Sequence, residues 1–213
     1  MSAVGRAFRV GVMVSGEGTN LQALLDTVHG REGAEVVAVA ASRAGIPALD
    51  RAARAGVEAA VFALEDHPER EARDAAVAGW LASREVDLVV LAGWMQLLTP
   101  GFLERFPGRV VNVHPALLPA FAGLNPIEQA VAYGVTVFGV TVHFVDEGVD
   151  SGPIILQRAI EMRGPRDAAA VRAALQPLEH DLLPEAVRLI ARGAVRIDPE
   201  QPRHVLVDDG PAG

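Results

Sequence analysis

Five short apolar runs between residues 8 and 114 each have the length of a β-strand. Between the first four runs lie segments whose apolar residues recur at helical spacing. The runs are Phe8–Val14, Glu35–Ala41, Val57–Phe62, Val86–Ala92 and Val110–His114, and helices are expected after Asn20 and over Pro47–Ala55 and Pro68–Arg84. Strands that alternate with helices pair in parallel, because each helix returns the chain across the sheet. The sequence therefore predicts an α/β fold: a mostly parallel twisted sheet with helices on both faces.

The second half of the chain begins with a different pattern. Val135–Val145 alternates like a long strand, and the acidic turn Asp146–Pro153 leads into a second strand, Ile154–Ile160. Two strands joined by a short turn pair antiparallel, so the sheet should become mixed toward the C-terminal half.

The remaining elements predict one domain that ends before the C-terminus. We expect a helix from near Pro126, a helix over Asp167–Arg192 that Pro177 and Pro184 kink or divide, and a short strand over Ala194–Asp198. The domain then covers residues 1–198, and residues 199–213 form a short tail whose last residues are loose.

Composition narrows the chemistry. The chain has 213 residues and a net charge of −8, which argues against a dedicated binder of nucleic acid or anionic membranes. It contains no cysteine and no lysine, so thiolate nucleophiles, thiolate metal sites and Schiff-base chemistry are excluded. The start of the sequence lacks the apolar core of a signal peptide, and no run is long enough to span a membrane. We expect a cytoplasmic protein, a monomer or homodimer, with small-molecule partners.

Two polar side chains emerge together from the strand Val110–His114. Successive residues of a strand face opposite sides, so Asn112 and His114 point to the same side. Pro115 cannot donate to a sheet ladder, and it ends the strand next to His114. Ligands of open α/β sheets bind at this carboxyl end. An isolated histidine there is also compatible with a satisfied polar group of no catalytic role.

The turn Ser15–Asn20 (SGEGTN) lies between the first strand and the first helix. Gly16 and Gly18 allow the backbone to approach a ligand, and the helix amino terminus suits a phosphate. Thr19 or Asn20 could cap the helix or bind the ligand. A glycine-containing turn without a ligand is equally compatible. A second apolar segment, Gly93–Pro100, follows the most apolar strand and could line a pocket for a flat ligand or pack into the core.

Four segments, in this order and spacing, carry a family resemblance: SGEGTNLQALLD, LAGWMQLLTP, NVHPALLP and TVHFVDEGVDSGPIILQ. Together they resemble the phosphoribosylglycinamide formyltransferases, the folate-dependent enzymes of purine synthesis. The resemblance covers Arg9 to Arg192. It implies a Rossmann-like formyltransferase fold, a single catalytic domain, and transfer of the formyl group of 10-formyltetrahydrofolate to the amine of 5-phosphoribosylglycinamide. Folate is then a co-substrate, and no metal is required.

The resemblance also implies residue roles. The implied catalytic residues are Asn112, His114 and Asp150. The implied ribotide-binding residues are Gly18, Thr19, Asn20 and Glu179. The implied folate-binding residues are Arg70, Met95, Gln96, Leu97, Leu98 and Asn112, with the backbone of Val145–Asp150 closing the pocket.

The chemistry explains these residue types. A neutral amine attacks the formyl carbon directly and creates a tetrahedral oxyanion. The amide of Asn112 can donate to that oxygen, a contribution of about 3 kcal/mol. A charged His114 can stabilise the same oxygen and pass a proton to the leaving nitrogen, and a neighbouring carboxylate favours its charge. Composition alone would allow Asp146 or Glu147 as that carboxylate; the resemblance selects Asp150.

The chain departs from the family pattern at two places. The loop after LLP has Ala122-Gly123 and Asn125-Pro126 where relatives have Pro-Gly and a histidine, and Gln96 replaces an arginine. We interpret His143 as a structural or supporting residue. The alternatives to the transferase are a formyltetrahydrofolate hydrolase, which carries an extra amino-terminal domain, and a methionyl-tRNA formyltransferase, which adds an RNA-binding domain. A noncatalytic nucleotide-binding module is an alternative of another class.

Overall fold

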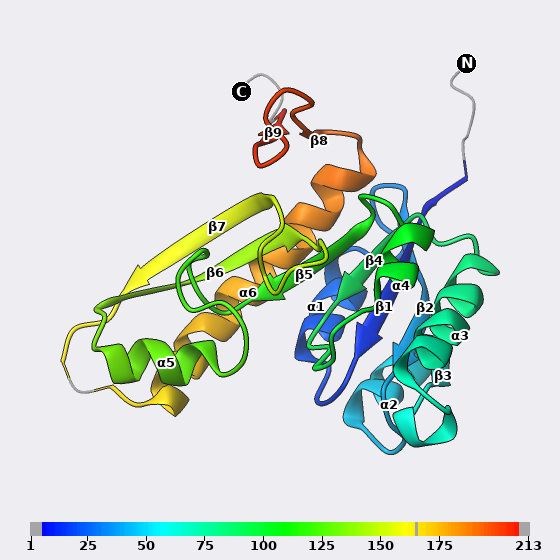
Figure 1. The fold of residues 1–213 in the computed structure, drawn as a ribbon, viewed down its shortest axis with the longest axis horizontal. Helices are drawn as coiled ribbons and strands as arrows, with labels where there is room; N and C mark the ends of the chain where they lie inside the picture. The colour runs from blue at the N-terminus through cyan, green and yellow to red at the C-terminus, as the bar shows by residue number, and fades with distance from the viewer. Residues whose placement is uncertain (1–5, 165, 209–213) are drawn as a thin grey trace. The chain divides into compact units, whose positions relative to one another are not determined.

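A computed structural model describes residues 6–164 and 166–208, and its chain forms two compact units, 1–110 and 111–213 (Figure 1). The first unit contains β1 to β4, and the second contains β6 to β9. Strand β5 (Val110–His114) begins at the last residue of the first unit. The sequence predicted a single catalytic domain over 1–198; that the two units act together as one domain stays our proposal.

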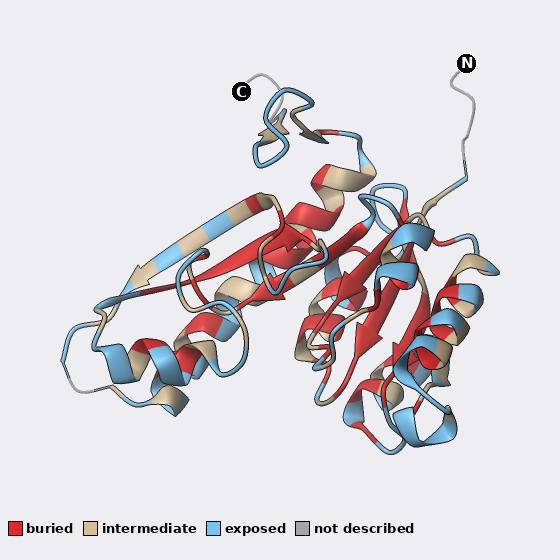
Figure 2. Ribbon diagram, in the orientation of Figure 1, coloured by how far each residue is buried: buried red, intermediate tan, exposed pale blue. Residues whose placement is uncertain are grey.

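Parallel strands form the sheet of the first unit. Its order is β3-β2-β1-β4, and the register pairs Val12 of β1 with Val39 of β2 and with Val90 of β4. The central strands are buried on both faces, as their near-continuous apolar sequences require (Figure 2). The strands are β1 (Phe8–Val14), β2 (Ala34–Ala41), β3 (Glu58–Val61) and β4 (Leu88–Leu91).

Helices flank this sheet on both sides (Figure 1). The right-handed crossovers that join β1, β2 and β3 put α1 and α2 on one face, whereas α3 returns from β3 to β4 across the other. The helices are α1 (Thr19–Thr27), α2 (Pro47–Arg54), α3 (Arg70–Ala82) and α4 (Pro100–Arg105), with a 3-10 turn at Leu64–Asp66. The sequence placed Pro68 in the first turn of α3, but the helix begins two residues later, and the sequence did not predict α4.

Antiparallel strands form the sheet of the second unit, in the order β5-β6-β7. The long helix α6 packs on β6 and β7. It continues through Pro177 and Pro184, so the expected division is wrong, and Asp167 caps it by accepting from the N–H of Ala170. The elements are α5 (Pro126–Tyr133), β6 (Val137–Phe144), β7 (Ile154–Glu161) and α6 (Ala168–Ala191).

A small hairpin follows α6. Its strands are β8 (Val195–Ile197) and β9 (Val205–Val207), and β9 also contacts β7. Residues 199–208, predicted as part of the tail, therefore complete a hairpin, and residues 209–213 lie outside the described residues. The parallel and then mixed arrangement confirms the predicted α/β class. Over the described residues, no helix has both the length and the apolarity needed to cross a bilayer.

Candidate active site

Strand β5 delivers two polar side chains, as its alternation predicted. Asn112 and His114 lie on one face, and the strand ends at His114, directly before Pro115. Antiparallel pairing sets Asn112 opposite His143 of β6, and His114 opposite Thr141. The register therefore brings His143 beside Asn112.

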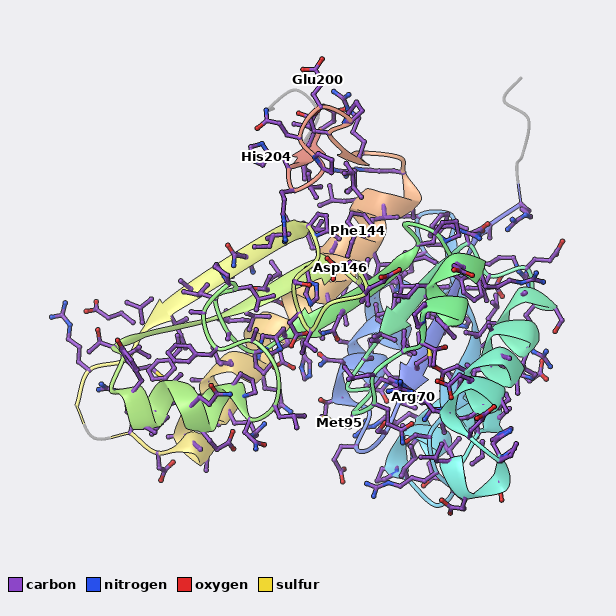
Figure 3. The ribbon with its side chains drawn as sticks, in the orientation of Figure 1. Arg70, Met95, Phe144, Asp146, Glu200 and His204 are labelled. Carbon is purple, nitrogen blue, oxygen red and sulfur yellow. The ribbon has the colours of Figure 1, made fainter. Side chains whose placement is uncertain are left out.

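Asp150 enters this site from the loop between β6 and β7. Its backbone is left-handed, with φ 49°. Two residues later, a Cβ on Gly152 would lie 1.9 Å from the carbonyl oxygen of Phe144, so only glycine lets the loop pack this tightly against the end of β6. Figure 3 shows Phe144 and Asp146 at this end of the strand. Close packing at Gly152 fixes the place from which Asp150 reaches inward.

The other two acids of the loop have different environments. The Asp146 Oδ1 atom accepts from the Ser151 hydroxyl at 2.7 Å and from the N–H of Gly148 at 3.1 Å, so it stabilises the loop itself. Glu147 is exposed. Of the three acids that composition allowed, Asp150 is the one that contacts His114 and Asn112.

The carboxylate of Asp150 is the centre of the cluster. Its Oδ2 atom lies 3.3 Å from Nδ1 of His114 and accepts from the N–H of Gly123 at 2.9 Å. Its Oδ1 atom accepts from Nδ2 of Asn112 at 3.2 Å and lies 3.5 Å from Nε2 of His143. One carboxylate thus orients an amide and two imidazoles.

Asp150 is held in its charged form. Burial raises the pKa of this carboxyl, but the hydrogen bond from His143, the N–H of Gly123 and the charge of His114 outweigh burial. The resulting pKa is below the ordinary aspartate value. Asp150 therefore places a negative charge 3.3 Å from Nδ1 of His114.

The contacts of His114 show which ring nitrogen faces the loop. Nε2 lies 2.9 Å from the carbonyl oxygen of Phe121, which can only accept, so Nε2 carries a hydrogen. Nδ1 lies 3.3 Å from Oδ2 of Asp150. The Nε2–H group can donate to a substrate oxygen once the Phe121 carbonyl has moved away.

His143 is buried behind Asn112. Its Nδ1 lies 2.8 Å from the carbonyl oxygen of Phe144, which can only accept, so Nδ1 carries a hydrogen. In the neutral ring, Nε2 then accepts from Nδ2 of Asn112 at 3.3 Å; in the charged ring, it donates to Asp150. In the neutral form His143 thus contacts the amide directly, and in the charged form it contacts the carboxylate that holds the amide; its supporting role stays a prediction.

The glycine turn belongs to the first unit. Gly18, with φ 70°, is the residue that precedes α1, and a Cβ there would lie 2.7 Å from the Cβ of Ala48. Thr19 and Asn20 follow it inside the helix, so neither caps α1, and of the two predicted alternatives only ligand binding stays a prediction. Arg51 of α2 supports the turn by donating to the Glu17 carbonyl at 2.8 Å and to Oε1 of Gln22 at 3.1 Å.

The apolar segment after β4 is also in the first unit. Met95 and Leu97 expose 75% and 57% of their surfaces, whereas Trp94 between β4 and Met95 is buried. The N–H of Met95 donates to the hydroxyl of Ser15 at 3.1 Å, which ties the segment to the end of β1. Because these two side chains are exposed, they do not pack into the core. Exposed apolar side chains on an anchored backbone are suited to contact a flat ligand.

The other predicted site residues lie on separate elements. Arg70 is the first residue of α3, exposed at the same sheet end as Met95 (Figure 3). Gln96 and Leu98 are partly exposed in the segment after β4, and Glu179 is partly exposed on α6. The sequence did not single out Arg51 or Ser15, because their contacts join residues distant along the chain.

Comparison with known proteins identifies matches over most of the chain. Residues 8–187 match the Formyl transferase family. The glycinamide ribonucleotide transformylase 1 of Symbiobacterium toebii has 46% identity and a TM-score of 0.90, with 95% of each chain covered. The whole-chain likeness supports the predicted Rossmann-like formyltransferase fold.

Two curated relatives differ in length. The phosphoribosylglycinamide formyltransferase of Mycobacterium tuberculosis is 43% identical over 189 residues, which cover 89% of this chain and 87% of that protein. The trifunctional purine biosynthetic protein adenosine-3 of Homo sapiens is 40% identical over 190 residues, 89% of this chain. The chain spans 14% to 19% of the length of such trifunctional relatives.

Proposed function

Because the chain belongs to the formyl transferase family, we propose that it transfers the formyl group of 10-formyltetrahydrofolate to the amine of 5-phosphoribosylglycinamide. The products are formyl-phosphoribosylglycinamide and tetrahydrofolate. The observation that carries the proposal is the Asp150 carboxylate, which lies within 3.3 Å of both Nδ1 of His114 and Nδ2 of Asn112. Relatives that match most of this chain bear the names of this activity.

The geometry supports direct attack through a tetrahedral intermediate. The neutral amine of the ribotide adds to the formyl carbon, and the carbonyl oxygen becomes an oxyanion. Nε2–H of His114 and an N–H of Asn112 are the donors proposed for this oxygen, and Asn112 must exchange one of its bonds to Asp150 and His143 to donate to it. His143 and Asp150 hold the Asn112 amide from one side, so the amide is oriented before substrate binds.

Proton movement completes the reaction. The attacking nitrogen loses a proton, N10 of the folate gains one, and the C–N10 bond breaks as the oxyanion collapses. We propose that His114 gives a proton to N10 and takes up the proton that the attacking nitrogen loses, so the ring is restored at the end of the reaction. Asp150, whose pKa is below the ordinary aspartate value, stays charged throughout.

Substrate binding is proposed from the other predicted residues. The amino terminus of α1, with Gly18, Thr19 and Asn20, is the proposed phosphate site, since the backbone N–H groups and the dipole of a helix amino terminus favour an anion. Glu179 is proposed to bind the ribotide. The segment Met95–Leu98, with Arg70, is proposed to bind the folate. The cytoplasmic location and the monomer or homodimer state stay predictions.

Two alternatives predict different behaviour. A hydrolase would use water in place of the amine and would consume the folate without ribotide. A noncatalytic nucleotide-binding module would bind the ribotide phosphate equally well after His114→Ala and would show no turnover. The oriented Asn112–His114–Asp150 cluster favours catalysis over the binding module.

The deciding experiment follows the loss of 10-formyltetrahydrofolate spectroscopically, with and without the ribotide. Loss that depends on the ribotide, together with formylated product, establishes the transferase. Equal loss in both assays identifies the hydrolase. No loss in either assay, with tight ribotide binding, identifies the binding module.

A further inference from the structure

A buried ion pair on α3 has no role in the proposed reaction. Arg73 and Asp74 are both fully buried. The Oδ1 atom of Asp74 accepts from Nη2 of Arg73 at 2.6 Å and from Nε at 3.0 Å. The two residues are adjacent in sequence, so the pair needs no distant element to form.

Stability alone does not account for this pair. Two charges lose their hydration on burial, and well-packed apolar residues often replace such a pair without loss of stability. Moreover, among the described residues no group accepts a hydrogen bond from the buried Nη1 atom of Arg73, which adds a further desolvation cost. A contribution to the free energy of unfolding therefore does not explain why both charges are buried here.

Both residues contact the segment that follows β4. The free oxygen of Asp74, Oδ2, accepts from the N–H of Thr99 at 2.8 Å, in the interior. The guanidinium carbon of Arg73 lies 5.3 Å from the ring centre of Trp94, a cation–π distance. Trp94 and Thr99 are the residues directly before and after Met95–Leu98. The ion pair therefore contacts this segment at both of its flanking residues.

The segment is fixed at its other end by Ser15. The N–H of Ser15 donates to the Gly93 carbonyl at 3.2 Å, and the Ser15 hydroxyl accepts from the N–H of Met95. Between these anchors, Met95 and Leu97 turn outward. The backbone of the segment is thus held by hydrogen bonds at both ends, and side chains between these bonds are exposed.

We propose that Arg73 and Asp74 are positioning residues that hold the segment Met95–Leu98 in its folate-binding conformation by anchoring Thr99 and Trp94. This inference rests on the proposed function of that segment. The pair does not touch the reacting atoms, so its loss should weaken folate binding and leave ribotide binding unchanged. Because Arg73 holds the Asp74 carboxylate in one orientation, Oδ2 fixes the direction of the Thr99 N–H. A solvated carboxylate would be free to rotate and would not fix it.

Two matched double variants test the anchor. Arg73→Met with Asp74→Asn removes both charges but retains an oxygen that can accept from Thr99. Arg73→Met with Asp74→Leu removes the charges and the acceptor together. Calorimetry with 5-formyltetrahydrofolate, which has no formyl group on N10, measures folate binding without turnover. We expect the Asn form to bind within about threefold of the native protein, and the Leu form to bind tenfold or more weakly. Ribotide affinity should change less than twofold in both.

A second variant tests the same bond from its other side. Thr99→Pro deletes the donor N–H, and the φ of −80° at this position is compatible with proline. It should reproduce the folate defect of the Leu form.

Trp94 fluorescence tests the contact with Arg73. In a Trp80→Phe background, which leaves one tryptophan, the emission should shift when Arg73 is replaced by Met and should return to its original position when Arg73 is replaced by Lys.

The outcomes separate this inference from the proposed function. Native protein that binds no 5-formyltetrahydrofolate and shows no turnover overturns both. Native binding together with equal folate affinity in the Asn, Leu and Pro variants overturns the positioning role alone. Equal weakening of folate and ribotide binding also overturns it, because that result indicates general loss of structure.

Discussion

The carbonyl oxygen of Phe121 lies 2.9 Å from Nε2 of His114, the atom that the proposed reaction needs for the substrate oxygen. The N–H of Gly123, two residues later, donates to Asp150 at 2.9 Å. One short stretch of loop therefore engages both proposed catalytic side chains through its backbone. A substrate oxygen must displace the Phe121 carbonyl before His114 can donate to it.

This displacement predicts a change in hydrogen exchange. Adding the ribotide with 5-formyltetrahydrofolate should release the Gly123 N–H from Asp150 and speed exchange across residues 119–125, while β5 stays protected. Mass spectrometry of peptides from the loop and from β5 makes the comparison within one experiment. Unchanged exchange in the loop would show that substrate reaches His114 without moving Phe121.

Asp150→Asn should retain folate binding and lose most turnover. The carboxylate that faces Nδ1 of His114 at 3.3 Å loses its charge, so kcat should fall about 10²-fold or more. Glu147→Gln in the same loop is the control, because its exposed side chain should leave activity near native. Steady-state rates and folate binding by calorimetry check both variants, and near-native turnover by Asp150→Asn would refute the role of Asp150.

Asn112→Ala should lower kcat by about 10²- to 10³-fold, the range for loss of one oxyanion donor. His143→Gln should have a smaller effect on kcat, since the Asn112 amide remains but loses one of its two orienting partners. Rates at saturating concentrations of both substrates make this measurement. If His143→Gln were the more damaging of the two, His143 itself would be the group that acts on substrate.

Arg51→Met should weaken ribotide binding. Arg51 supports the turn before α1 through the Glu17 carbonyl and Gln22, so its removal loosens the proposed phosphate site. The KM for ribotide should rise several-fold, and the KM for folate should stay within twofold. Arg54→Met, an exposed arginine on the same helix, controls for the loss of positive charge. Equal effects of the two variants would indicate a long-range charge effect rather than support of the turn.

Asp87 predicts a pH-dependent contribution to stability. Burial raises the pKa of this carboxyl, but hydrogen bonds from Arg6 at 2.7 Å and from the Arg9 N–H at 2.9 Å outweigh it, and the pKa is lowered. A carboxyl with a lowered folded-state pKa stabilises above its unfolded pKa and loses this contribution as the pH falls through the folded value. Asp87→Asn should therefore cost about 1 kcal/mol at pH 7, given the exposure of Arg6.

Thermal melts across pH check this expectation. The difference between native protein and Asp87→Asn should shrink as the solution becomes more acidic than the ordinary carboxyl pKa. Glu104→Gln, at an exposed carboxyl nearby in sequence, should show no such trend. A constant difference at every pH would mean that packing, and not charge, explains the contribution of Asp87.

Local patterns were sufficient to predict the strands and the orientation of Asn112 and His114. Period-two alternation and the stop at Pro115 are properties of neighbouring residues, so the sequence displays them directly. The choice of Asp150 over Asp146 depended on the family resemblance. What separates the two in space is the packing of Gly152 on the end of β6, and no local pattern shows such a contact.

The errors have similar causes. Proline disfavours a helix interior, yet α6 continues through Pro177 and Pro184, and Pro184 is buried, so tertiary packing overrides local preference. Strand β9 has only three residues, too few for alternation to be recognised, and it pairs with β8 across a longer loop. The sequence did not predict the Arg73–Asp74 pair, because charged residues on a helix that mixes alanine and charged residues indicate an exposed face.

Contacts made by peptide groups have an evolutionary consequence for the loop at Phe121 and Gly123. The carbonyl and the N–H that meet His114 and Asp150 belong to every amino acid except proline, which lacks the N–H. The side chain at Ala122 can therefore change without altering the resting arrangement of the two proposed catalytic groups. Gly123 and Asn125 have less freedom, because their φ values of 87° and 54° are left-handed and favour glycine or asparagine, so divergence at Ala122 is a poor guide to divergence in activity.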